Sequence, residues 1–173
     1  MENVKEISKG FIILGGKVMV SDPCYEMGVW CQGVIDNMLK GIYKCDLEMC
    51  DGVWGPRVSA IQVTHVDYAN KFLAYNCEFN ICVDSGQAGI FDYGYYEKHH
   101  NGKTDDEWYD AICDKTISMH NGTELLDGNT VDELGFVSSS GYGDGSYDCW
   151  VAEHDGKVVA IRVEFITEDE EEM

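Results

Sequence analysis

Three segments of this 173-residue chain combine aspartate with glycine, serine or proline at places where apolar runs end. They are Ser21-Asp22-Pro23-Cys24-Tyr25, Val83-Asp84-Ser85-Gly86-Gln87-Ala88-Gly89, and the longer stretch from Ser138 to Asp148, which reads SSSGYGDGSYD. Three separate turns are one interpretation, because Gly, Asp and Ser are the ordinary turn residues. The other is that the segments meet at one edge of a β scaffold, where their oxygen atoms form a binding surface.

We predict the second arrangement, because the third segment is longer and denser in polar groups than a turn requires. The predicted surface contains carboxylates, hydroxyls, an amide and one thiol. Its candidate ligand-binding residues are Asp22, Cys24, Tyr25, Asp84, Ser85, Gln87, Ser139, Ser140, Tyr142, Asp144, Ser146 and Asp148.

Aspartates at such an edge also permit acid chemistry. Close carboxylates can hold a proton to neutral pH, so a hydrolase or metal-dependent enzyme would use Asp22, Asp84 and Asp144. The spacing of Asp144, Ser146 and Asp148 resembles the start of many calcium loops, but a cysteine follows where the EF-hand requires glycine. The sequence has no G-x-S-x-G nucleophile elbow. No catalytic or metal-binding residue is assigned, and enzymatic activity stays an open alternative to binding.

The charge of the chain indicates what kind of partner it attracts. There are 32 acidic residues against 12 Lys and Arg, which gives a formal net charge of −20 at pH 7. Such a field repels phosphate backbones, so we do not expect direct nucleic-acid binding. Solubility is the simpler explanation of the charge, and attraction of a cationic protein is the functional one. We expect the partner to be a cationic protein or a small molecule.

The eight cysteines indicate reduced thiols rather than a disulfide framework. The beginning of the chain, MENVKEISKGF, mixes acids with lysines, and no apolar stretch reaches the roughly 18 residues of a membrane span. None of the pairs Cys24/Cys31, Cys45/Cys50 and Cys77/Cys82 forms the C-x-x-C of structural zinc sites. We therefore expect a cytoplasmic protein with no membrane association and no cofactor.

Short alternating apolar runs predict most of the secondary structure. Phe11–Leu14 and Lys17–Val20 flank Gly15-Gly16, a pattern typical of a hairpin with a two-residue turn. The segment Gly28–Leu39 is predicted to be a loop with at most a short helix, since two glycines and Asp36-Asn37 weaken its helical spacing. Further strands are predicted within 42–50, 54–66, 72–83, 90–92, 135–137, 147–153 and 159–165.

The best helix signal lies between these strands. Thr104 followed by Glu107 is a capping-box pattern, and acids fill the first turn, where the helix dipole favours them. Trp108, Ala111 and Ile112 form the expected buried stripe. Together the elements predict a mainly β (α+β) domain over residues 1–166, an antiparallel sandwich or partly open barrel with one amphipathic helix. Residues 167–173 are predicted to form a disordered acidic tail.

Four segments carry a resemblance to a known family. They are SDPCY at 21–25, WGPRV at 54–58, VDSGQAG at 83–89 and SSSGYGDGSY at 138–147. In this combination the chain resembles an uncharacterised family of small bacterial and phage-borne proteins over most of residues 11–166. The resemblance implies a bacterial or prophage origin and a cytosolic location, and it assigns no activity. For a protein of that kind, the charge favours an acidic inhibitor of a cationic or nucleic-acid-binding host protein.

Overall fold

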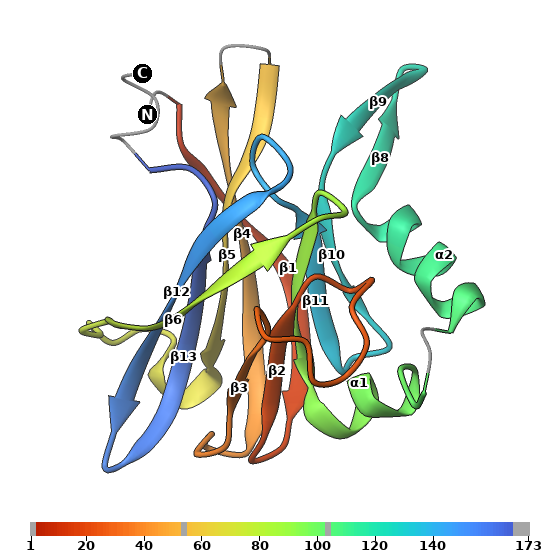
Figure 1. The fold of residues 1–173 in the computed structure, drawn as a ribbon. Coiled ribbons are helices and arrows are strands. Elements are labelled where there is room, and N and C mark those ends of the chain that lie inside the picture. Colours follow the sequence, from red (N-terminus) through yellow and green to blue (C-terminus); the bar gives the residue numbers. More distant parts are fainter. Residues whose placement is uncertain (1–2, 53–54, 103–104, 168–173) are drawn as a thin grey trace.

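The computed structural model describes residues 3–52, 55–102 and 105–167, and antiparallel β-strands dominate it (Figure 1). The larger sheet has six strands. In spatial order they are β1 (Lys5–Leu14), β4 (Gly41–Gly52), β5 (Gly55–His65), β13 (Lys157–Glu164), β12 (Gly145–His154) and β6 (Asn76–Val83). A 3-10 turn, η1 (Val66–Tyr68), follows β5.

The second sheet has five strands and packs face to face with the first. In spatial order they are β10 (Gly128–Val131), β11 (Gly135–Ser139), β7 (Gln87–Asp92), β2 (Val18–Ser21) and β3 (Gly33–Ile35). The main core lies between the sheets and includes Tyr43, Leu47, Ile90, Phe136 and Ile161, each fully buried. The described residues thus form a mainly β, antiparallel sandwich, as predicted, and neither sheet closes into a barrel.

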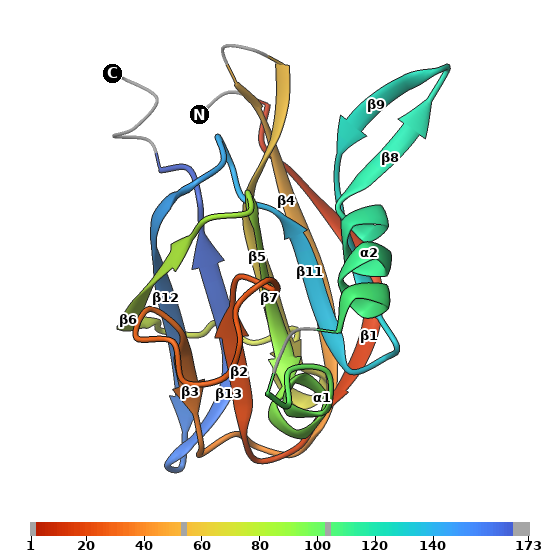
Figure 2. The same cartoon turned by 45° about the vertical axis from the view of Figure 1, so that its right-hand side comes forward.

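Two short helices cover the outer face of the five-stranded sheet (Figure 2). They are α1 (Tyr93–Lys98) and α2 (Asp106–Lys115), and their aromatic side chains pack on Met19, Phe91 and Val137 of that sheet. The predicted helix is therefore present, with Trp108 and Ile112 buried, although Ala111 is exposed. Its N-cap is Asp105, whose side chain accepts a hydrogen bond from the Trp108 N–H, and Thr104 lies outside the described residues.

Helix α1 was missed because it has only six residues and follows its strand without a break. Asp92 ends β7 and caps the helix, accepting a hydrogen bond from the Tyr95 N–H. A second unpredicted feature is the hairpin of β8 (Ile117–His120) and β9 (Thr123–Leu126), which projects beside α2 (Figure 1). The turn Asn121-Gly122 joins its strands with positive φ at both residues.

The predicted hairpin around Gly15-Gly16 is wrong. Strand β1 pairs with β4 in the larger sheet, whereas β2 pairs with β3 and β7 in the smaller one. A two-residue hairpin turn requires a positive φ, and neither Gly15 nor Gly16 has one. The glycine pair instead carries the chain from one sheet to the other.

The segment Gly28–Leu39 contains no helix. It contributes the three-residue strand β3, which adds to the edge of the smaller sheet beside β2. Gly33 faces the Phe79 ring so closely that a Cβ there would lie 1.9 Å from a ring carbon. Close packing of this edge on β6 therefore accounts for the glycine. Among the described residues, no helix is long and apolar enough to cross a membrane.

Candidate functional site

A buried carboxylate joins two of the three predicted segments. Asp22 follows β2 and is fully buried. Its Oδ2 accepts hydrogen bonds from the backbone N–H groups of Asp84 and Ser85, both at 2.8 Å, and its Oδ1 accepts from the Cys24 N–H at 2.9 Å and the Ser85 hydroxyl at 2.7 Å. Four donors thus satisfy a group that would otherwise be costly to bury.

The third segment joins the second through the backbone. The Ser140 N–H donates to the Gly86 carbonyl at 2.9 Å, and Val83 pairs with Gly145 where β6 meets β12. Within the third segment, Ser140 Oγ donates to the Gly143 carbonyl at 2.9 Å. The three segments therefore meet at one end of the sandwich, and we call residues 22–25, 84–87 and 139–146 the loop surface.

Helix α1 fixes the first segment from the other side. The Tyr96 hydroxyl lies within hydrogen-bonding distance of the Asp22 and Tyr25 carbonyls, and the His100 ring stacks on Tyr96 with centroids 3.8 Å apart. The His100 ring nitrogens lie 2.8 Å from the Tyr96 carbonyl and 2.9 Å from the Pro23 carbonyl. A ring nitrogen that carries a proton donates to the carbonyl it faces. These buried contacts give the loop surface a rigid support.

Two acids face solvent at the loop surface. Asp84 comes directly after Val83, and Asp144 directly before Gly145, so the two aspartates continue the β6–β12 pairing on adjacent backbones. Both are exposed, and neither forms an ion pair with a described residue. Tyr25 lies beside Asp84, since Cys31 and Asp84 add to burial in raising the pKa of its hydroxyl. This part of the surface is negative and accessible.

Asp22 cannot serve as a shared catalytic acid with Asp84 and Asp144 in this arrangement. Its acceptor positions are taken by four protein donors, and its side chain is closed to solvent. Its role is to hold the loops together. Cys24 is also a poor nucleophile, because burial and the neighbouring Asp22 carboxylate raise the pKa of its thiol to about 12.

Of the remaining predicted residues, Gln87 belongs to the buried contacts beneath the loop surface, and Ser146 and Asp148 lie on the solvent face of β12. Gln87 is buried, donates to Thr116 Oγ1 at 3.1 Å and accepts from the Tyr109 hydroxyl at 3.1 Å. Ser146 and Asp148 alternate with the buried Tyr147 and Cys149 along β12, so they lie on the solvent face of the larger sheet. The extended strand separates them from one another, and no group of three or more described His, Cys, Asp or Glu residues is placed to hold a metal ion.

A cavity of about 260 Å³ opens between the loop surface and the β4–β5 hairpin. It is lined by Arg57, Gly86, Leu126, Ser139, Gly141, Tyr142 and Gly143. Tyr142 reaches across to the hairpin, where a Cβ on Gly52 would lie 2.8 Å from its hydroxyl oxygen. Sequence reasoning found Ser139 and Tyr142 but missed Arg57, although this residue belongs to the WGPRV segment and is one of only two arginines in the chain.

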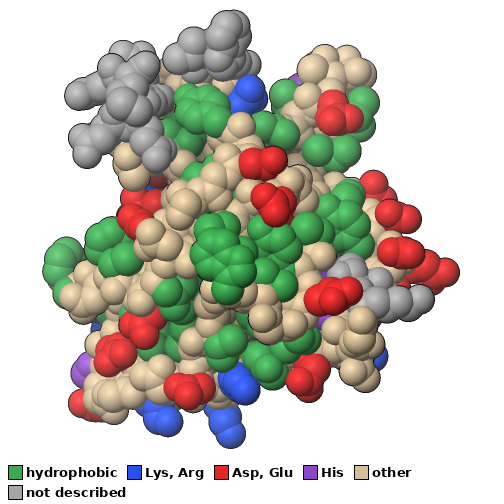
Figure 3. Space-filling view, viewed as in Figure 1, with side chains coloured by type: hydrophobic (Ala, Val, Ile, Leu, Met, Phe, Trp, Pro, Cys, Tyr) green, Lys and Arg blue, Asp and Glu red, His purple; other side chains and the backbone are tan. Residues whose placement is uncertain are grey.

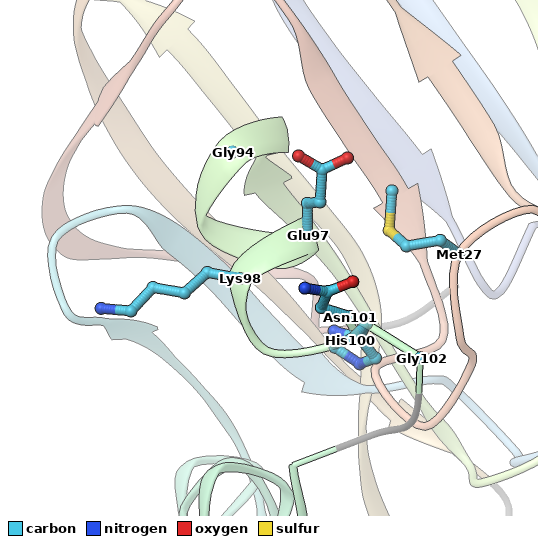
Figure 4. Close-up of a pocket in the computed structure, with 7 residues that line it drawn as sticks. All are labelled: Met27, Gly94, Glu97, Lys98, His100, Asn101 and Gly102. Atoms are coloured by element: carbon cyan, nitrogen blue, oxygen red, sulfur yellow. The ribbon is translucent and has the colours of Figure 1, made fainter.

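A larger cavity of about 450 Å³ lies beside α1 (Figure 4). Met27 and Glu97 face each other across it, whereas the Lys98 side chain points away. Its buried member, His100, has carbonyl oxygens at both ring nitrogens. The other polar lining residues, Glu97, Lys98 and Asn101, are exposed, and none of the predicted site residues lines this cavity, so we place the candidate site at the loop surface and its cavity. No protein-family model, curated protein or solved structure matches this chain.

Proposed function

We propose that the protein is a binding module that recognises a cationic protein through the exposed acids of the loop surface, and that it inhibits this partner by covering its basic site. The observation that supports this proposal is the pair Asp84 and Asp144, placed on adjacent backbones by the pairing of Val83 with Gly145, with Asp84 fixed by the buried Asp22 and both acids without an ion pair among the described residues.

The rest of the surface is compatible with such a partner. Acidic side chains lie among apolar ones on the face that Figure 3 shows, so a basic segment would meet both charge and packing surface. Tyr142 is 47% exposed at the same end of the molecule. Aromatic groups bind cationic side chains over their ring faces, which adds to the attraction of the carboxylates. The total charge of −20 would also accelerate encounter with a basic protein.

A basic peptide tests where cations bind. An octa-arginine peptide titrated into the ¹⁵N-labelled protein should shift the amide resonances of residues 84–86 and 143–146, and its affinity should fall steeply as salt is raised because exposed charges are screened. Asp84→Asn combined with Asp144→Asn should weaken binding about tenfold.

The matched control changes the same charge on α2, where Asp110 and Asp114 are exposed. Asp110→Asn combined with Asp114→Asn should leave the affinity within about twofold. Equal loss in the two double variants would mean that the peptide senses only net charge, and the proposal would then be wrong. Shifts confined to α2 would have the same meaning.

A further inference from the structure

The cavity beside the loop surface contains an unusual pair of polar groups. Ser139 is 6% exposed, and its hydroxyl oxygen is buried without a hydrogen-bond partner among the described residues. A buried hydroxyl that makes no hydrogen bond forfeits its bonds to water, so such groups are rare in folded proteins. Ser139 lines the cavity, where a ligand would supply the missing partner.

Arg57 is the second of these groups. Its Nη1 donates a hydrogen bond to the adjacent Pro56 carbonyl at 3.2 Å, and it forms no ion pair with a described carboxylate. The other arginine, Arg162, binds Glu48 at 2.8 Å and lies 3.6 Å from Glu164. In a chain with 32 acids, an arginine in the wall of a cavity that has no carboxylate partner among the described residues can direct its other planar donors to an anion.

The remaining walls limit the size and charge of that anion. A volume of about 260 Å³ holds about nine water-sized groups. Leu126 and Tyr142 provide apolar wall, and Gly86, Gly141 and Gly143 have no side chains to keep a ligand from the backbone. Only Arg57 among the lining residues is cationic, and the exposed Asp84 and Asp144 are nearby, so the cavity suits one negative charge better than the nearly two of a phosphate.

We propose that this cavity binds the carboxylate of a small organic acid, held by Arg57 and Ser139, with the apolar part of the acid against Leu126 and Tyr142. The Arg57 guanidinium lies 5.9 Å from the centre of the Tyr142 ring, so both residues reach the same ligand. This proposal does not rest on the proposed protein partner, because Arg57 and Ser139 take no part in that binding, although Tyr142 borders both surfaces.

Benzoate is a suitable probe, because it fits within this volume and carries one carboxylate. Titration into the ¹⁵N-labelled protein should shift the amides of Gly86, Gly141 and Gly143. Benzamide has the same shape without the charge and should bind at least about tenfold more weakly, as should inorganic phosphate. Equal binding of benzamide, tighter binding of phosphate, or no shift at these glycines with benzoate or succinate would overturn the proposal.

Two variants separate recognition from folding. Arg57→Gln should raise the Kd for benzoate about tenfold or more, whereas Lys157→Gln, which removes an exposed charge at the β12–β13 turn, should not change it. Ser139→Ala should raise the Kd about threefold to tenfold while the melting temperature of the free protein stays equal or rises, since the hydroxyl it removes has no partner. Unchanged benzoate binding in both Arg57→Gln and Ser139→Ala would contradict the assignment.

Discussion

Two aspartates are buried among the described residues, and their surroundings differ. Asp22 is fully buried and accepts four hydrogen bonds, three of them from backbone N–H groups. Asp46, on the outer face of β4, is 7% exposed; among the described residues its Oδ1 has no hydrogen-bond donor, and the Lys44 ammonium lies 3.4 Å away. Each has a cysteine close by in sequence, Cys24 and Cys45, whose thiol pKa is raised by burial and then by the carboxylate.

Asp22 therefore stabilises the arrangement of the loops, whereas Asp46 is buried by the sheet without a comparable set of hydrogen bonds. Three of the four donors to Asp22 come from a segment more than 60 residues away in the chain, so its carboxylate fixes the loop after β2 to the loop before β7, beyond the point where the pairing of these two strands ends. Asp46 lies inside a strand whose ladder forms without it. Substitutions at the two positions should therefore differ in size and in where their effects appear.

The largest effect is expected for Asp22→Ala. The change leaves the N–H groups of Cys24, Asp84 and Ser85 without their acceptor, so the free energy of unfolding should fall by about 3–5 kcal/mol. Urea denaturation measures this loss. A decrease below about 1 kcal/mol would show that water or other groups replace the carboxylate and that Asp22 does not organise the loops.

Ser85→Ala should have a smaller effect of the same kind. It removes the 2.7 Å hydrogen bond from the Ser85 hydroxyl but keeps the two backbone donors on Oδ2. The expected loss in the free energy of unfolding is about 1–2 kcal/mol. In the Asp22→Ala background the same substitution should cost less, because only the longer contact with Gln87 Oε1 at 3.3 Å remains, and additive losses would contradict a shared network.

The thiol of Cys24 reports on the Asp22 carboxylate directly. Because its pKa is about 12, alkylation by iodoacetamide should be slow at pH 8 and should accelerate about tenfold per pH unit up to about pH 11. Asp22→Asn removes the negative charge, so the pKa should fall and the midpoint of the rate profile should move to lower pH. The exposed Cys77 serves as the internal control, and an unmoved Cys24 midpoint would contradict the carboxylate's part in the shift.

The smallest effect is expected for Asp46→Asn. Neutralising a carboxylate whose Oδ1 has no hydrogen bond removes a desolvated charge and weakens only the contact with Lys44. The free energy of unfolding should change by less than about 0.5 kcal/mol. A loss as large as that of Ser85→Ala would mean that Asp46 is bound as tightly as Asp22 and would remove the distinction between them.

Local patterns predicted the elements whose partners are close in sequence. The alternating apolar run within 42–50 predicted β4, and the runs within 147–153 and 159–165 predicted β12 and β13, which pair with one another. The hairpin prediction at Gly15-Gly16 failed, because an apolar-glycine-apolar pattern fits both a hairpin and a connection between two sheets. Only the distant partners β4 and β7 distinguish these two arrangements.

The candidate site shows the same limit. Its segments were identified from composition, because Asp, Gly and Ser concentrate where strands end. The burial of Asp22 could not be read locally, since it depends on donors at Asp84 and Ser85. Arg57 looked like an ordinary strand residue until the fold placed it against Gly86 and Tyr142 at one cavity.

Amide hydrogen exchange in Asp22→Asn tests most directly whether the three segments form one supported surface. The Ser140 N–H donates to Gly86, not to Asp22, so it senses the carboxylate only through the coupled loops. We predict that Ser140 loses protection together with Asp84 and Ser85, whereas Val163 in the centre of the larger sheet does not. Full protection of Ser140 in this variant would contradict the account.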